Sequence, residues 1–102
     1  MTIFIDNDEL MHRFWTMQAN KKEIEIKCFF SVDEFLENAQ RIEKDTEIYI
    51  DCELADGVRG EVESKKLYEL GFTNLYLATG HPVRNIDKPA WVKEVCGKRP
   101  PF

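Results

Sequence analysis

The stretch IYIDCELADG, residues 48–57, decides how this chain folds. Its first three residues are hydrophobic and run into Asp51, after which the sequence turns polar and reaches Gly57. This pattern predicts a short buried strand that ends at an aspartate, followed by a loop. An aspartate at such a place is a candidate phosphoryl acceptor, metal ligand or phosphatase nucleophile, or else an ordinary turn residue.

Strand and helix patterns alternate on both sides of this stretch. The S-x-x-E pair of Ser31 and Glu34 is typical of a helix start, and Gly71 is typical of a helix end. Such alternation predicts one α/β domain over residues 1–102, with a parallel sheet between helices on both faces. The expected strands cover residues 2–5, 24–30, 47–50, 75–80 and 91–96, and the expected helices cover residues 9–22, 31–42 and 61–70.

Apolar spacing predicts which face of the first helix is buried. Leu10, Phe14 and Met17 recur at i, i+4 and i+7, with Met11 and Trp15 beside them, which predicts an amphipathic helix with this side toward the core. His12 lies between charged neighbours and is expected at the surface, whereas Trp15 is expected to be a packing residue.

The remaining segments fit the same α/β pattern. Strict alternation over residues 24–30 predicts a strand at the edge of the sheet. Leu67 and Leu70 should point inward from the third helix. Two prolines within residues 81–90 argue against a full helix there.

Composition limits the classes of function. The net charge is -5 and the 14 basic side chains are scattered, which argues against a nucleic-acid-binding protein. We expect no membrane span and no signal peptide, because the chain has neither a run of about 18 apolar residues nor a basic N-terminal region. Cys28, Cys52 and Cys96 lie far apart and outside any CxxC spacing, which favours free thiols in the cytoplasm.

The residues that follow the strands carry the candidate chemistry. In an open parallel sheet, ligands bind beyond the carboxyl ends of the strands, so these residues should meet in one pocket. Crowded carboxylates there could share a Mg²⁺ ion, which prefers oxygen ligands. A hydroxyl and an ammonium could bind phosphoryl oxygens, and an aspartate could attack phosphorus to form an acyl phosphate. The residues at these strand ends are Asp6, Asn7, Asp8, Asp51, Cys52, Glu53, Thr79, Gly80, His81, Gly97 and Lys98.

Four motifs at these strand ends resemble those of one family, the receiver domains of two-component response regulators. The resemblance covers nearly the whole chain and is carried by FIDND at 4–8, IYIDCELADG at 48–57, LATG at 77–80 and GKRP at 97–100. It implies a three-layer flavodoxin-like fold whose parallel sheet has five strands in the order 2-1-3-4-5.

The resemblance also implies roles for individual residues. Asp51 matches the phosphoryl acceptor, Thr79 the switch hydroxyl and Lys98 the lysine of the family's K-P motif. The implied cofactor is Mg²⁺, held by Asp6, Asn7, Asp51 and the backbone carbonyl of Glu53. The implied partner is a sensor histidine kinase or a histidine phosphotransfer domain, which donates the phosphoryl group from a phosphohistidine.

The sequence departs from the family at several of these positions. Asn7 stands where the second acidic residue is usual, and an amide oxygen is a weaker metal ligand than a carboxylate, although Asp8 could replace it if the register shifts. The usual Met-Pro after the acceptor is Leu54-Ala55, and the usual glycine comes one residue later, at Gly60. Arg99 separates Lys98 from Pro100.

The C-terminal end departs most. The segment after Thr79 is too short for a normal fourth helix, and four residues after Lys98 leave no room for a fifth. The family uses these helices for output and dimerisation. We therefore expect one of two arrangements. The chain is a receiver domain excised from a larger hybrid sensor kinase, or it exposes an apolar sheet face that a partner covers. In the second case, the partner could be another copy of the chain, which would form a homodimer through this end.

Two other functions compete with phosphoryl acceptance. A degenerate receiver would be a protein-docking module without phosphorylation, as Asn7 and the missing helices suggest. A haloacid-dehalogenase type phosphatase would need D-x-D at the nucleophile, whereas this chain has Asp51-Cys52-Glu53. As a receiver, the chain would at most catalyse its own phosphorylation and dephosphorylation, and Glu53 and His81 would form a rim pair that tunes the lifetime of the phosphate.

Overall fold

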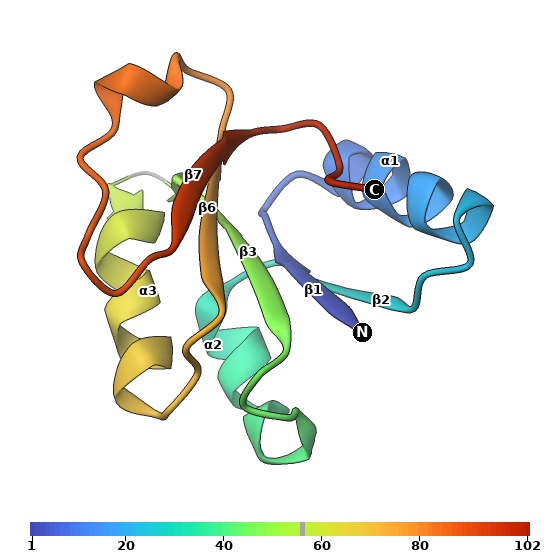
Figure 1. The fold of residues 1–102 in the computed structure, drawn as a ribbon, viewed down its shortest axis with the longest axis horizontal. Coiled ribbons are helices and arrows are strands. Elements are labelled where there is room, and N and C mark those ends of the chain that lie inside the picture. Colours follow the sequence, from blue (N-terminus) through green and yellow to red (C-terminus); the bar gives the residue numbers. More distant parts are fainter. Residues whose placement is uncertain (56) are drawn as a thin grey trace.

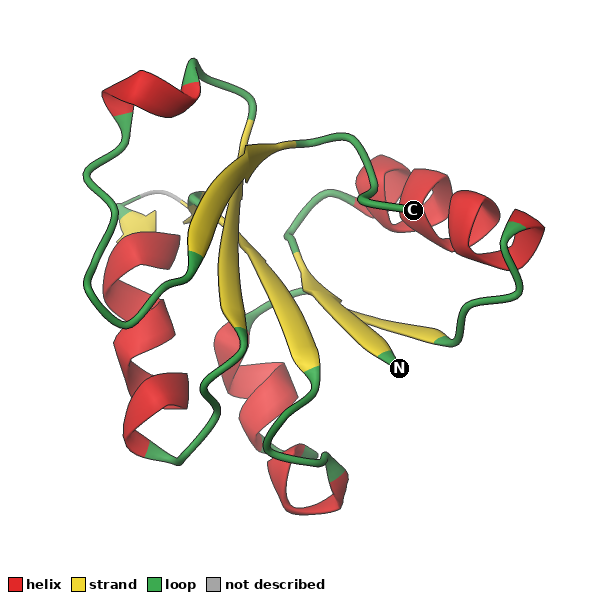
Figure 2. Cartoon of the chain, in the orientation of Figure 1, coloured by secondary structure: helices red, strands yellow, loops and turns green. Residues whose placement is uncertain are grey.

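The computed structural model describes residues 1–55 and 57–102 as a twisted sheet with helices on both faces (Figure 1, Figure 2). Within these residues, seven strands, three α-helices and two 3₁₀ helices follow one another. They are β1 Thr2–Ile5, α1 Glu9–Lys21, β2 Ile26–Phe29, α2 Val32–Leu36, η1 Ala39–Arg41, β3 Glu47–Asp51, β4 Glu53–Ala55, β5 Val58–Arg59, α3 Gly60–Glu69, β6 Leu75–Thr79, η2 Val83–Asn85 and β7 Glu94–Gly97.

The main sheet has five parallel strands in the order β2-β1-β3-β6-β7. This confirms the predicted order 2-1-3-4-5, because β6 and β7 are the fourth and fifth strands of this sheet. Ile5 pairs with Ile50 at the ends of β1 and β3, and Thr79 pairs with Gly97 at the ends of β6 and β7. This register places Asp6, Asp51, Thr79 and Lys98 at one edge.

Hydrophobic side chains fill both spaces between the sheet and the helices. On the face covered by α2 and α3, alternate residues of the central strands pack with Phe35, Leu67 and Phe72. On the opposite face, covered by α1, Phe4, Tyr49 and Ala78 pack with Trp15. Trp15 is fully buried and stacks on Phe4, with ring centroids 3.9 Å apart. The packing role predicted for Trp15 is therefore confirmed, and the domain has three layers.

The buried face of α1 differs from the predicted one. Leu10 and Met17 are exposed, Phe14 is partly buried against the cluster around Trp15, and the helix buries His12, Trp15 and Ala19. The stripe at i, i+3 and i+7 satisfies helical periodicity as well as the predicted stripe does. Trp15 decides between the two stripes, because its large ring fits the space above Phe4. The prediction that His12 lies at the surface was also wrong.

The ends of the helices follow the sequence signals. The carboxylate of Asp8 accepts a hydrogen bond from the backbone N–H of Leu10 (2.9 Å), so Asp8 caps α1. The hydroxyl of Ser31 accepts one from the backbone N–H of Glu34 (3.1 Å), which confirms the capping box. Gly71 follows α3 with φ of 102°, a conformation that favours glycine at a helix end. The second helix is shorter than predicted and ends at Leu36, before η1.

Two predictions about the segment after β3 were wrong. The loop expected there contains a small antiparallel hairpin of β4 and β5, a turn that Gly57 permits with φ of 75°. Leu70, which was expected to point inward, is exposed; it is the first residue after α3, which ends at Glu69. Leu67 is buried as predicted.

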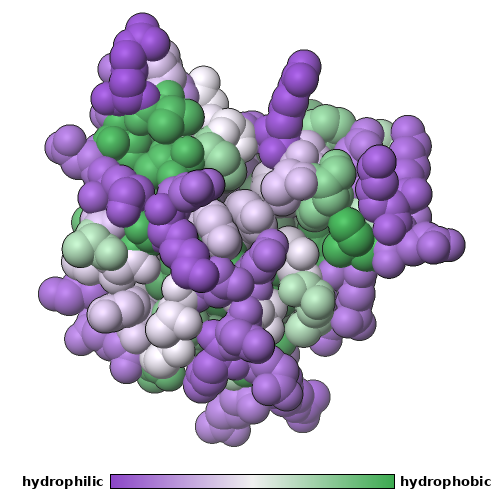
Figure 3. Space-filling model, viewed as in Figure 1, coloured by the Kyte–Doolittle hydropathy of each residue, from purple (hydrophilic) through white to green (hydrophobic). Residues whose placement is uncertain are grey.

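The C-terminal part is irregular apart from β7. Residues 80–93 hold η2 in place of a full fourth helix, and β7 begins at Glu94, later than predicted. Within the described part of the chain, residues 98–102 form neither helix nor strand, and the ring of Phe102 meets the edge of Trp15. Figure 3 shows hydrophobic atoms gathered near η2, where Val83 is exposed, on an otherwise mostly hydrophilic face.

Cys28, Cys52 and Cys96 are free thiols. None of the helices within residues 1–55 and 57–102 has the length and apolar character that a membrane crossing requires.

Candidate functional site

A pocket of about 330 Å³ lies at the carboxyl edge of the main sheet. It collects nine of the eleven residues predicted from the strand ends; Cys52, which is buried in the core, and Gly97 do not line it. Its lining residues are Asp6, Asn7, Asp8, Asp51, Glu53, Thr79, Gly80, His81 and Lys98.

The ammonium of Lys98 lies between two buried carboxylates. Its Nζ is 2.7 Å from Oδ2 of Asp6 and 2.8 Å from Oδ1 of Asp51. Asp6 is 0% exposed and Asp51 is 4% exposed, so both charges are largely removed from water and depend on this pairing. One ammonium facing two carboxylates leaves an excess negative charge in the pocket.

Local backbone hydrogen bonds orient the polar side chains. Oδ1 of Asp6 accepts from the N–H of Asp8 (2.9 Å), and Oδ1 of Asp51 accepts from the N–H of Glu53 (3.2 Å). The hydroxyl oxygen of Thr79, which is buried, accepts from the N–H of His81 (3.0 Å). Each bond spans two residues, a pattern that holds Asp and Thr side chains at strand ends.

Gly60 packs directly on the backbone of Asp51. Its N–H donates to the carbonyl of Cys52 (2.9 Å), which ties the start of α3 to the end of β3. A Cβ atom at position 60 would lie 2.1 Å from the carbonyl oxygen of Asp51. Position 60 therefore needs glycine because the backbone of Asp51 lies so close, and not because of an unusual φ.

The cluster shifts the proton affinities of its members. Burial raises the pKa of Asp51 above its usual value; the hydrogen bond from Lys98 lowers it, and the charge of Asp6 raises it again. Burial lowers the pKa of Lys98, but the hydrogen bonds to Asp51 and Asp6 outweigh burial and raise it overall. Lys98 therefore stays protonated at neutral pH.

Glu53 and His81 meet at the rim of the pocket. Oε1 of Glu53 pairs with Nε2 of His81, and both side chains are more than half exposed. The predicted rim pair is thus present as a contact between the segments after β3 and β6.

The donors fit a small hard cation in type and charge. Asp6 and Asp51 offer carboxylate oxygens, Glu53 a backbone carbonyl and Asn7, at the exposed rim, an amide oxygen. Among residues 1–55 and 57–102, no group of three or more acidic, His or Cys side chains is arranged to hold a metal. A bound Mg²⁺ would therefore rely on carbonyl, amide or water oxygens beside the carboxylates.

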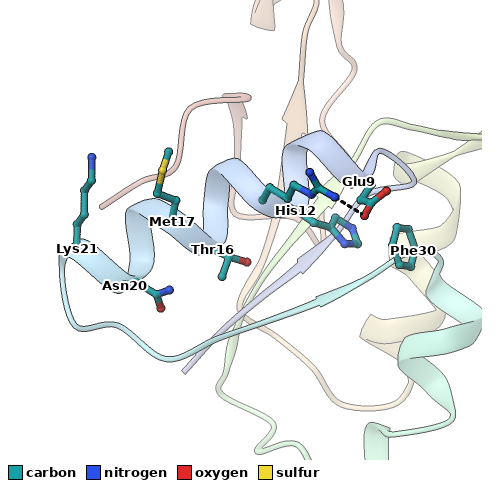
Figure 4. Close-up of a pocket in the computed structure, with 8 residues that line it drawn as sticks. Glu9, His12, Thr16, Met17, Asn20, Lys21 and Phe30 are labelled. Atoms are coloured by element: carbon teal, nitrogen blue, oxygen red, sulfur yellow. Dashed lines mark hydrogen bonds and ion pairs between the residues drawn. The ribbon is translucent and has the colours of Figure 1, made fainter.

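Two residues of α1 that the sequence did not single out for the site contact its backbone. Nε2 of His12 lies 2.6 Å from the carbonyl oxygen of Asp6, and Nε1 of Trp15 donates to the carbonyl oxygen of Lys98 at 3.0 Å. Figure 4 shows His12 on the side of α1 that faces Phe30, at one end of a groove of about 730 Å³ along the helix. The contact of Trp15 joins segments 83 positions apart, and that of His12 was missed because this residue was expected at the surface.

No protein-family model and no curated protein matches the chain. Its structure is similar to the crystal structure of the N-terminal domain of a response regulator/sensory box/GGDEF 3-domain protein from Carboxydothermus hydrogenoformans. The match has a TM-score of 0.75 and 13% identity, and covers 95% of this chain and 80% of that one. With the observed strand order, it shows that the chain has the flavodoxin-like fold of a response-regulator receiver domain.

Proposed function

We propose that the protein is a cytoplasmic phosphorelay receiver in which Asp51 accepts a phosphoryl group. The donor is the phosphohistidine of a sensor histidine kinase or a histidine phosphotransfer domain. The observation that carries this proposal is the Lys98 ammonium held between Asp6 and Asp51 in a pocket at the carboxyl edge of the sheet. The receiver fold supports it.

The proposed transfer uses the pocket residues as follows. A carboxylate oxygen of Asp51 attacks phosphorus, the bond from phosphorus to the donor imidazole nitrogen breaks, and its electron pair stays on that nitrogen. The product is an acyl phosphate on Asp51. Lys98 exchanges its contact with Asp51 for a phosphoryl oxygen, and the hydroxyl of Thr79 donates to another. When bound by Asp6, Asp51 and Glu53, Mg²⁺ supplies positive charge that offsets the phosphoryl oxygens.

Incubation with acetyl phosphate and Mg²⁺, followed by intact mass measurement, tests the proposal. We expect the wild-type protein to gain one phosphoryl group and Asp51→Asn to gain none. The variant should be at least as stable as the wild type at neutral pH, because burial raises the pKa of Asp51 and so disfavours its ionised form. Equal uptake by a folded Asp51→Asn variant would contradict the assignment of the acceptor.

The second candidate function is a docking module without phosphorylation. Asn7 in place of a second carboxylate favours it, because the amide weakens metal binding. This candidate predicts no mass gain in the wild type even at high Mg²⁺ concentration.

The rim pair should lengthen the lifetime of the acyl phosphate. The contact between Glu53 and His81 lies at the mouth of the pocket, where attacking water would enter. We expect His81→Ala to lose its phosphoryl group several-fold faster than the wild type, measured as decay of the phosphorylated mass after removal of acetyl phosphate. The double variant Glu53→Ala/His81→Ala should decay no faster than His81→Ala, since one contact is lost in both. Unchanged decay in His81→Ala would show that the pair has no such role.

A further inference from the structure

We propose that His12 and Trp15 of α1 are positioning residues, which hold Asp6 and Lys98 by their backbone carbonyls and so fix the distance between their side chains. The inference deepens the proposed function, because it concerns how the acceptor pocket keeps its geometry.

Trp15 holds the main chain of Lys98. Its indole Nε1–H donates to the Lys98 carbonyl at 3.0 Å, across 83 positions of sequence. Lys98 follows Gly97, the last residue of β7, so its carbonyl lies beyond the strand and takes its hydrogen bond from α1. The indole ring is fully buried and lies parallel to the ring of Phe4 at an angle of 4°. A ring fixed in this way holds the start of the C-terminal segment in one place.

His12 holds the main chain of Asp6. A carbonyl oxygen only accepts hydrogen bonds, so the contact of 2.6 Å requires that Nε2 of His12 carries the hydrogen. The N–H of Asp6 donates to the carbonyl of Phe29, so both backbone groups of Asp6 are engaged, one by β2 and one by α1. The imidazole lies beside the ring of Phe30 (Figure 4), and the two ring centroids are 4.2 Å apart.

The two contacts make α1 a common support for both ends of the chain. His12 and Trp15 are three residues apart and lie on the same face of the helix. Asp6 and Lys98 are 92 positions apart, yet their side chains meet at 2.7 Å. Because α1 holds both carbonyls, the place of the Lys98 ammonium between Asp6 and Asp51 depends on two N–H donors of one helix.

The two tryptophans provide a matched comparison. Nε1 of Trp91 donates to the hydroxyl of Ser64 at 2.8 Å, on the opposite face of the sheet and outside the pocket. Trp15→Phe and Trp91→Phe each remove one indole N–H and keep an aromatic ring. We expect Trp15→Phe to slow phosphoryl uptake from acetyl phosphate roughly fivefold to tenfold, as the loss of one hydrogen bond allows, and Trp91→Phe to leave the rate within about twofold. Equal rates in both variants would overturn the inference.

Two substitutions at position 12 distinguish the hydrogen bond that His12 donates from the packing of its ring. His12→Gln keeps an N–H donor on a side chain of similar reach, whereas His12→Leu keeps only apolar bulk. We expect His12→Gln to take up phosphoryl groups faster than His12→Leu. Equal uptake in the two variants would assign His12 a packing role alone.

Selective acylation of lysines tests the inference even if the wild type accepts no phosphoryl group. The Lys98 amine is held by two carboxylates and is 25% exposed, so it should react slowly with an amine-acylating reagent. We expect Trp15→Phe to raise the acylation of Lys98 several-fold, as measured by peptide mass spectrometry. Acylation of Lys66, which is exposed, should not change in this variant. In Trp91→Phe, the acylation of every lysine should match that of the wild type. If Trp15→Phe leaves the acylation of Lys98 unaltered, the positioning role is refuted. If Trp15→Phe alters the acylation of Lys98 but the wild type takes up no phosphoryl group, only phosphoryl acceptance is refuted.

Discussion

Gly60→Ala should destabilise the protein by about 3 kcal/mol and strongly reduce phosphoryl uptake. The new Cβ would lie 2.1 Å from the carbonyl oxygen of Asp51 and 2.9 Å from its carbonyl carbon. Both atoms belong to the backbone at the end of β3, so no side-chain rotation relieves the overlap. Either α3 or the end of β3 must shift, and a shift of β3 moves Asp51 away from Lys98.

Gly97→Ala provides the control for this prediction. A Cβ at position 97 would meet nothing within 4 Å, although the residue precedes Lys98 directly. Its free energy of unfolding should stay within about 1 kcal/mol of the wild type, because alanine restricts the unfolded chain without a clash. Chemical denaturation of both variants measures the difference. A Gly60→Ala protein as stable as Gly97→Ala would show that the start of α3 adapts freely.

Lys98→Met should cost about 3 kcal/mol of stability at pH 7, because it leaves two buried carboxylates without their cation. The cost should shrink towards pH 4. Burial already raises the pKa of Asp51, and without Lys98 that pKa rises further, so the variant gains stability as Asp51 takes up a proton in acid. In the wild type, the raised pKa of Lys98 gives stability that is fully present below its usual pKa and is lost as pH rises through the raised value.

Denaturation curves at pH 7 and pH 4 measure this dependence. Lys66→Met is the matched control, since Lys66 pairs with Glu63 on the surface, where solvent screens the pair, and its loss should leave the stability nearly unchanged at either pH. A Lys98→Met deficit of the same size at both pH values would contradict the electrostatic explanation and indicate a loss of packing instead.

The sheet and the pocket could be predicted because they depend on local patterns and one topological rule. The three central strands of the main sheet each have an apolar run of their own, and parallel strands bring their carboxyl ends to one edge. Knowing that Asp51 and Thr79 follow such runs is enough to bring them together. The small hairpin was missed, although the Asp-Gly pair at 56–57 is a known hairpin signal.

The face of α1 could not be predicted from apolar spacing. Leu10, Phe14 and Met17 form as regular a stripe as His12, Trp15 and Ala19, and the first stripe is the more hydrophobic. The second is buried because Trp15 fills the space above Phe4 and because the N–H groups of His12 and Trp15 meet backbone carbonyls. Those carbonyls come from Asp6 and Lys98, and their direction is a property of the folded sheet that side-chain hydropathy does not encode.

The long separation between Asp6 and Lys98 has a consequence for protein synthesis. During translation both carboxylates leave the ribosome before the lysine, since Asp6 precedes Lys98 by 92 positions and Asp51 precedes it by 47. Until β7 joins β6, the acidic pair has no cation, and pairing of such distant segments is a late event in folding. Fragments that stop before β7, whether from stalled translation or from cleavage within residues 80–93, would carry Asp51 without Lys98. A signal that requires Lys98 would therefore come only from chains in which β7 has joined the sheet.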